Sequence, residues 1–426
     1  MNDIIEDLFK IYLSCLDSYN PKIYQVVNNK YTIIDKSMLT VYLYIKILED
    51  RNEKNLEATN TLSNYLLKQI IFSETGNIAL EISDKSKVLL YNETLDKLIL
   101  EKFDYKNRIM VNLKYNYKNV KFNKYNELIT FLEDIAEYSI FYKMFSIGNK
   151  EITPFLQSCN NKIINNFINI DDYFYDEKRK IVDLIKDSSF FQSQYGNLIS
   201  IALNLKDVYR YSQITTQLPE NVLFHQYTTA IMSLLISEYC NNVLNENIDI
   251  YSILVKSLFH DFGEYKGNEI ITQFKNYNNI TKKMFAEIEK KDEEDLKEKI
   301  GKNLYEIISN YHTDAEGFIS EMMDKILGIM KLWVEVGYFN NNNFIKTINS
   351  VYQDRFKIFL KIENIYRLKN KDFYMNLLRE YYIYIKEHLI EKDLQYFLKY
   401  FTEEELEQFR DELDYLKRNQ SEFLKM

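Results

Sequence analysis

The chain has very few residues that turn or break a helix, with 9 Gly and 3 Pro among 426 residues. Sandwiches and barrels need a turn every few residues, so this scarcity argues against them and favours long helices. Hydrophobic residues make up 46% of the chain, which is ample for a buried core and excludes wholesale disorder. We therefore predict an all-α fold. At about 100–200 residues per domain, the length indicates two domains or one large helical body.

Apolar residues recur at helical spacing in several segments. Within 225–239 and 319–333 they step by three and four residues, which is typical of an amphipathic helix. The stretch 338–426 contains neither Gly nor Pro, which suits long helices. Within the stretches 213–221 and 340–343, turn-forming residues or an Asn run predict loops.

Charge and cysteine content narrow the class of protein. The net charge of −9 does not favour a protein that binds nucleic acids of any base sequence, although it is compatible with a local basic groove. Three Cys, at 15, 159 and 240, are too few and too scattered for a disulfide framework or a thiolate zinc site. No apolar run reaches about 18 residues. We expect a soluble, cytoplasmic protein with neither a membrane nor a nucleic acid as its partner.

A faint internal similarity connects two parts of the chain. Residues 66–74 resemble residues 254–261 in their spacing after a Lys, but chance matching in a low-variety sequence explains this equally well. A tandem duplication would divide the chain into domains 1–190 and 191–426. The first copy would be degenerate, since Ser73-Glu74 stands where the second copy has a His-Asp pair. It would then be a non-catalytic scaffold, a wall of the substrate pocket, or a built-in substitute for a dimer partner.

Histidine is rare, with 4 in the chain, so its placement is informative. His260 and Asp261 are neighbours at the end of an apolar run, where burial is costly unless they are paired or bind a metal. With His225 upstream and Asp324 downstream they form a ligand set suited to one Mn, Co, Ni, Fe, Zn or Mg ion. Taken singly, each of the four is better explained by a helix cap or a satisfied polar group in the core.

Four motifs surround these residues in a fixed order. They comprise Arg210 with Pro219-Glu220-Asn221 and His225; His260-Asp261 with Glu264; Gly267 with Glu269 and Lys275; and Asp324-Lys325 with Lys331, Glu335 and Gly337. Together they cover about 150 residues, the size of one domain. In type and order the motifs resemble those of the HD-superfamily metal-dependent phosphohydrolases, most closely the 5′-deoxynucleotidase branch.

The resemblance implies an HD-domain helical bundle and a metal centre. Carried over residue by residue, it implies His225, His260, Asp261 and Asp324 as metal ligands, with Asp261 also part of the catalytic centre. It implies that Glu264 orients or deprotonates the attacking water. If the helix before it continues, Glu264 stands one turn after His260 on the same face, where a general base belongs.

The resemblance also implies residues that bind the substrate. Arg210 matches the family's phosphate-contacting Arg, and Glu269 and Lys275 fall where the family lines its nucleotide pocket. A surface ion pair with Asp207 or Glu220 is the alternative reading for Arg210. The chain departs from the family where Tyr211 replaces a Trp, where Asn268 separates Gly267 from Glu269, and where Phe224 precedes His225 in place of a Glu. These departures concern sugar selectivity more than the metal site.

The predicted function follows from this chemistry. A divalent ion with open positions lowers the pKa of a bound water from about 15.7 towards about 7 and polarises a phosphoryl oxygen. We therefore predict a hydrolase that removes a 5′-phosphate from nucleotides by a metal-activated water. The alternatives are a hydrolase of another nucleotide phosphate such as a dNTP, a non-hydrolytic nucleotide- or metal-binding regulator, and a structural protein in which the ligands never converge. The expected partner is a nucleotide or a similar phosphorylated small molecule, and we expect a homodimer or a pseudo-dimer within one chain.

Overall fold

Helices form nearly all of the structure, a computed structural model that describes residues 2–18, 24–26, 29–75, 123–167, 172–212, 214–266, 279–310, 314–339, 341 and 368–385. The α-helices are α1 (Asn2–Ser18), α2 (Ile33–Arg51), α3 (Leu56–Thr75), α6 (Lys124–Ser146), α7 (Thr153–Asn166), α8 (Tyr175–Lys186), α9 (Gln194–Leu205), α10 (Val222–Val243), α11 (Ile250–Phe259), α13 (Asn279–Ile300), α14 (Lys302–Ser309), α15 (Ala315–Leu332) and α17 (Lys371–Ile385). Shorter elements are the 3-10 turns η2 (Lys150–Ile152), η3 (Phe190–Gln192) and η4 (Phe262–Lys266), the π-helical turn η5 (Trp333–Tyr338), and two antiparallel strands, β1 (Tyr24–Val26) and β2 (Asn29–Tyr31). The all-α prediction is confirmed.

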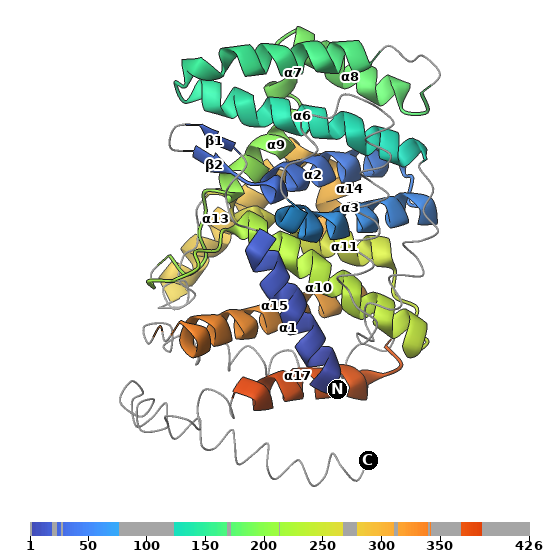
Figure 1. Cartoon of the computed structure of the whole chain (residues 1–426), viewed down its shortest axis with the longest axis vertical. Helices are drawn as coiled ribbons and strands as arrows, with labels where there is room; N and C mark the ends of the chain where they lie inside the picture. The colour runs from blue at the N-terminus through green and yellow to red at the C-terminus, as the bar shows by residue number, and fades with distance from the viewer. Residues whose placement is uncertain are drawn as a thin grey trace.

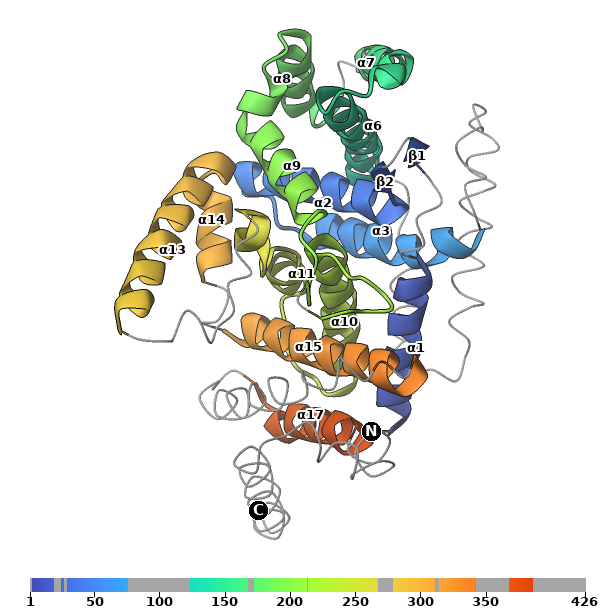
Figure 2. The same cartoon turned by 90° about the vertical axis from the view of Figure 1, so that its left-hand side faces the viewer.

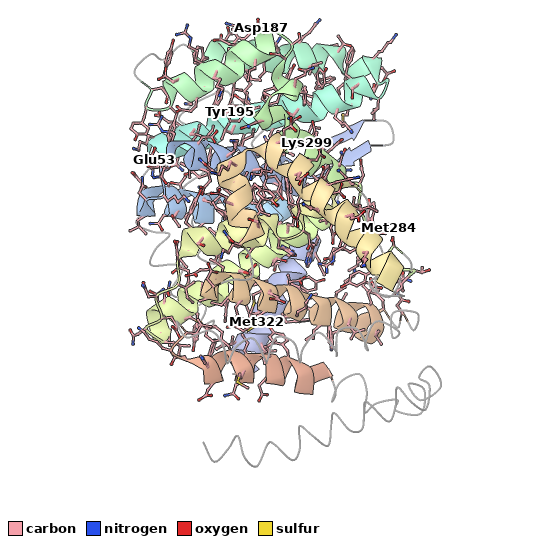
Figure 3. All side chains as sticks on the ribbon, turned by 180° about the vertical axis from the view of Figure 1, so that it is seen from behind. Glu53, Asp187, Tyr195, Met284, Lys299 and Met322 are labelled. Carbon is pink, nitrogen blue, oxygen red and sulfur yellow. The ribbon has the colours of Figure 1, made fainter. Side chains whose placement is uncertain are left out.

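The helices are stacked along the long axis of the molecule. In Figures 1 and 2, α6, α7 and α8 lie at one end, α2, α3 and α9 follow, and then come α10, α11 and α15, with α17 beyond them. Helix α1 crosses this stack and contacts α3, α10, α15 and α17. Seen from behind, α13 runs obliquely over the surface, with Met284 near one end and Lys299 near the other (Figure 3).

Two helices, α2 and α10, are buried on nearly all sides. Thr32 caps α2 through a reciprocal pair of hydrogen bonds with Asp35, and Asn52 ends it in the left-handed conformation at a φ of 53°. Asn221 caps α10, where its side chain accepts the backbone N–H of Phe224 at 2.8 Å. A helix that is apolar all round belongs in the core, and α2 packs there on α10 as well as on α3, α6 and α9.

The parts of the chain on either side of residue 190 share one hydrophobic core. Tyrosine hydroxyls also connect them: Tyr227 on α10 donates to the Leu66 carbonyl at 3.1 Å, and Tyr251 on α11 donates to Glu49 at 2.9 Å. The division into two domains, the tandem duplication and the oligomeric state stay predictions.

The helices predicted at 225–239 and 319–333 are confirmed within α10 and within α15 with the η5 turn that follows it. The residues of 213–221 that the structure describes form a loop, as predicted. Most of 338–426 lies outside the described residues, and so does the predicted Asn loop apart from Asn341. In the described ranges, no helix is long and apolar enough to cross a membrane. The cytoplasmic location stays a prediction.

Candidate metal centre

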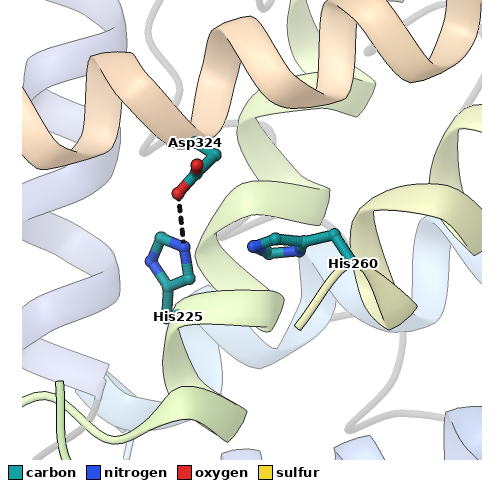
Figure 4. Close-up of side chains that lie close together, drawn as sticks. All are labelled: His225, His260 and Asp324. Atoms are coloured by element: carbon teal, nitrogen blue, oxygen red, sulfur yellow. Dashed lines mark hydrogen bonds and ion pairs between the residues drawn. The ribbon is translucent and has the colours of Figure 1, made fainter. Parts of the chain in front are cut away.

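Three helices bring the predicted metal ligands together. His225 lies in the first turn of α10, His260 directly follows α11, and Asp324 lies in the middle of α15. Because these three helices pack on one another in all three pairs, the side chains meet in the space between them. Figure 4 shows the Asp324 carboxylate and the two imidazole rings gathered around that space.

The distances within the cluster fit one ion. His225 Nε2 lies 2.8 Å from Asp324 Oδ1, and ligand-type atoms of His225, His260 and Asp324 all lie within 4.8 Å of one another. Asp261 adjoins them, with its Oδ2 3.1 Å from His260 Nε2 and 3.9 Å from His225 Nε2. Two ligands at about 2.0–2.2 Å from one ion lie about 3 Å apart when their bonds meet at a right angle. The group can therefore hold a divalent metal.

Both histidines are oriented through their Nδ1 atoms. His260 Nδ1 lies 2.8 Å from the Ser257 carbonyl, which only accepts, so this nitrogen carries a proton. His225 Nδ1 lies 3.0 Å from Glu220 Oε1. Burial alone would raise the pKa of Glu220, but its hydrogen bond with His225 lowers it, so this carboxylate accepts the proton of Nδ1. Both Nε2 atoms are then left to face the carboxylates, which is how a metal-binding imidazole is commonly held.

Neighbouring cations keep the two carboxylates of the cluster ionised. Lys325 Nζ lies 2.9 Å and Arg210 Nη1 lies 3.5 Å from the oxygens of Asp324. Burial alone would raise the pKa of Asp324, but Lys325 and Arg210 hold it well below its usual range. His260 and then Arg210 lower the pKa of the buried Asp261 in the same way. Ionised carboxylates are the form that binds a metal ion.

A closed loop places Arg210 beside the cluster. Its backbone N–H donates to the Glu220 carbonyl at 2.8 Å, and that of Val222 donates to the Val208 carbonyl at 2.9 Å. The side chain is 18% exposed and forms its ion pair with Asp324. Within the part of the chain that the structure describes, Nη1 is buried without a hydrogen-bond partner. This nitrogen faces Asp324 as an ion pair at 3.5 Å, so it places the positive charge of Arg210 at the cluster.

A buried ion pair holds the end of the same loop. Lys331 and Glu335 are 1% and 0% exposed, and their charged atoms lie 3.0 Å apart. Glu335 accepts the backbone N–H groups of Gln217 at 2.9 Å and Leu218 at 3.0 Å, and the Asn341 amide at 2.8 Å. Lys331 donates to the Leu218 carbonyl. The pair therefore fastens the segment between Arg210 and α10 to α15 and η5.

The α-helix does not continue from His260 to Glu264. Helix α11 ends at Phe259, and Glu264 lies half-buried on the 3-10 turn η4. Gly263 within this turn disfavours an α-helix by about 1 kcal/mol relative to Ala. Residues four apart in a 3-10 helix are separated by about 120° around the axis, so the face that Glu264 was expected to share with His260 is lost. The Glu264 backbone N–H instead donates to the Asp261 carbonyl at 3.0 Å.

Glu269 and Lys275, predicted to line the nucleotide pocket, lie outside the described residues. The sequence reasoning missed the contact between Glu220 and His225, because Glu220 was considered only as a surface partner of Arg210. Glu220 is 4% exposed. Its position in the sequence could have indicated the contact: Glu220 stands just before the N-cap Asn221, from which a side chain can extend over the first helical turn to His225.

One comparison with known proteins gives a match. Residues 197–357 match the family model described as 5′-deoxynucleotidase YfbR-like, while no curated protein and no solved structure matches the chain. The matched segment contains His225, His260, Asp261 and Asp324, and the family is a nucleotidase-type branch of the HD superfamily. The resemblance inferred from the four motifs is thereby confirmed: residues 197–357 are similar to the YfbR-like 5′-deoxynucleotidase family of the HD superfamily.

Proposed function

We propose that the protein is a metal-dependent phosphohydrolase that releases phosphate from nucleoside 5′-monophosphates. The observation that carries this proposal is the orientation of the two imidazoles. Each Nδ1 has its own acceptor, and each Nε2 lies near Asp261 or Asp324, so that four ligand groups surround one space. The family match over 197–357 supports the same chemistry.

The proposed cofactor is one divalent ion, Mn, Co, Ni, Fe, Zn or Mg, held by His225, His260, Asp261 and Asp324. Such an ion supplies an activated water and polarises a phosphoryl oxygen when it is bound. Arg210 binds the substrate phosphate in this proposal, because its fork of permanently charged donors suits phosphate and its side chain lies beside Asp324 at the cluster.

We assign Glu264 the role of orienting the attacking water and accepting its proton. This role rests on the place of Glu264 in the motif, three residues after Asp261, since the turn η4 does not keep it on the face of His260. A carboxylate close to the reacting water typically contributes about 10²–10⁴-fold to such a reaction. Lys325, which is ion-paired with Asp324, adds positive charge where the phosphate would enter.

The purified protein is expected to release phosphate from nucleoside 5′-monophosphates in the presence of Mn²⁺ or Co²⁺ and to stop when EDTA removes the ion. The measurement is phosphate release from a panel of ribo- and deoxyribonucleotides, as mono- and triphosphates. Tight nucleotide binding without turnover would instead indicate a regulatory binding protein. Release of triphosphate from dNTPs alone would instead indicate a hydrolase of dNTPs.

Glu220→Gln is expected to weaken Mn²⁺ binding by about 10- to 100-fold, the usual effect of removing a charged partner behind a ligating histidine. The neutral amide accepts more weakly from His225 Nδ1 and no longer makes the imidazole more basic. Isothermal titration with Mn²⁺ measures the change. Glu316→Gln is the matched control, since Glu316 is a 2% exposed carboxylate on α15 that accepts a backbone N–H from Asp249 at 3.0 Å. Equal affinity in the two variants would exclude an orienting role for Glu220.

A further inference from the structure

Helix α2 lies outside the segment that matches the family, but its Tyr42 contacts the helices that carry the candidate metal centre. This side chain is fully buried. Its hydroxyl lies 2.6 Å from Gln226 Oε1 and 3.1 Å from the Leu258 carbonyl. Gln226 directly follows His225 on α10, and Leu258 comes two residues before His260 on α11. One hydroxyl therefore contacts both of the helices that carry the imidazoles.

The ring of Tyr42 contacts the same region. Its centroid lies 4.8 Å from that of Phe259 and 5.2 Å from that of Phe262, and these two residues flank His260-Asp261 in the sequence. Aromatic pairs at such distances stabilise a core beyond the area that they bury. The ring thus supports the short segment on which the His-Asp pair stands.

The hydroxyl is available as a donor. Burial, and then the charge of Asp261, raise the pKa of Tyr42 well above its ordinary value, so the group stays protonated. The last carbonyls of a helix have no partner within the helix. At the end of α11, His260 Nδ1 donates to the Ser257 carbonyl, and the Tyr42 hydroxyl donates to the next carbonyl, that of Leu258.

We propose that Tyr42 is a positioning residue of the metal centre and fixes the distance between His225 and His260. Residues 1–190 would then be part of the working site rather than a separate support. The proposal rests on the proposed metal site, and it can be tested without any measurement of hydrolysis.

The test compares Tyr42→Phe with Tyr44→Phe. Tyr44 lies on the same helix, is equally buried, and donates to the Ala58 carbonyl at 3.0 Å, away from the imidazoles. Each substitution removes one buried hydroxyl and keeps the ring, so both are expected to lower the melting temperature by similar amounts. Only Tyr42→Phe is expected to weaken Mn²⁺ binding, by about 10-fold, the lower end for groups behind the ligands. It should also shift the visible absorption of bound Co²⁺, which reports ligand geometry.

Equal Mn²⁺ affinities and identical Co²⁺ spectra in the two variants would overturn the proposal. If Tyr42→Phe does not fold, Gln226→Met removes the partner of the hydroxyl on α10, and an unchanged Co²⁺ spectrum there would overturn it as well. Wild-type protein that binds Mn²⁺ but hydrolyses no nucleotide contradicts the proposed function, while the comparison of metal binding still decides the role of Tyr42. Wild-type protein that binds no divalent ion contradicts both.

Discussion

Asp324→Asn is expected to abolish stoichiometric metal binding and to lower kcat/KM for nucleotide hydrolysis by at least about 10³-fold. Asp324 is the only one of the proposed ligands on α15, and its Oδ1 lies 2.8 Å from His225 Nε2. An amide is a much weaker ligand than a carboxylate, and it also removes the negative charge that balances Arg210 and Lys325. The measurements are the metal content of the purified protein and the rate of phosphate release.

The control is Asp314→Asn, the same change on the same helix. Asp314 caps the N-terminus of α15, where it accepts the Gly317 N–H at 2.9 Å and pairs with Lys256. It lies ten residues before Asp324, about 15 Å along the helix axis. Asn is also a good N-cap, but the change takes the charged partner from the 3% exposed Lys256. We therefore expect this variant to lose stability, while the folded protein keeps its metal and its activity. If Asp324→Asn retained full metal content and activity, the proposed ligand set would be wrong.

The fold class and the convergence of the ligands could be predicted from the sequence for definite reasons. Scarce Gly and Pro leave few ways to end a helix, and the spacing of three and four residues in 225–239 and 319–333 recurs in α10 and α15. The positions of His225, His260 and Asp324 within ordered motifs indicated a common centre, because polar groups at the ends or in the middle of apolar helices need partners.

The contacts behind the ligands could not be predicted in the same way. The chain has 36 Tyr, and this number carries no information on which hydroxyls are buried at the centre. Tyr42 and Gln226 are far apart in the sequence, so their contact depends on how α2 packs against α10. Helix α11 ends at Phe259, before Glu264, and Gly263 makes a continued helix only about 1 kcal/mol less stable than Ala would, a difference that a pattern of hydrophobic residues does not reveal.

Lys331→Met is expected to lower the free energy of unfolding by about 3–5 kcal/mol, the usual cost of leaving a buried charge without its partner. Glu335 would remain at 0% exposure with its backbone and amide donors but without the cation 3.0 Å away. The Leu218 carbonyl would also lose its donor. Because this segment follows Arg210, we expect KM for the nucleotide to rise more than kcat falls. Urea unfolding and steady-state kinetics measure the two effects.

The chain offers an exposed pair with the same spacing as a control. Lys302 and Glu306 are also four residues apart, at 3.5 Å, with side chains 71% and 55% exposed, so Lys302→Met should cost about 0–1 kcal/mol. Adding Glu335→Gln to Lys331→Met should recover part of the loss, because the amide oxygen still accepts from Gln217 and Leu218 while no charge is left unpaired.

The loss caused by Lys331→Met should also depend on pH in a definite direction. Burial alone would raise the pKa of Glu335, but its hydrogen bonds from Gln217, Asn341 and Leu218 and the charge of Lys331 lower it in the folded protein. A carboxyl whose pKa is lowered on folding contributes stability above the unfolded pKa of about 4.3, and that contribution is lost as the pH falls through the folded value.

Without Lys331 the folded pKa of Glu335 rises, and Glu335 takes up a proton at a higher pH than in the wild type. The difference in unfolding free energy should therefore be largest near neutral pH and narrow in acid, whereas a constant difference would show that lost packing, rather than the unpaired charge, causes the destabilisation.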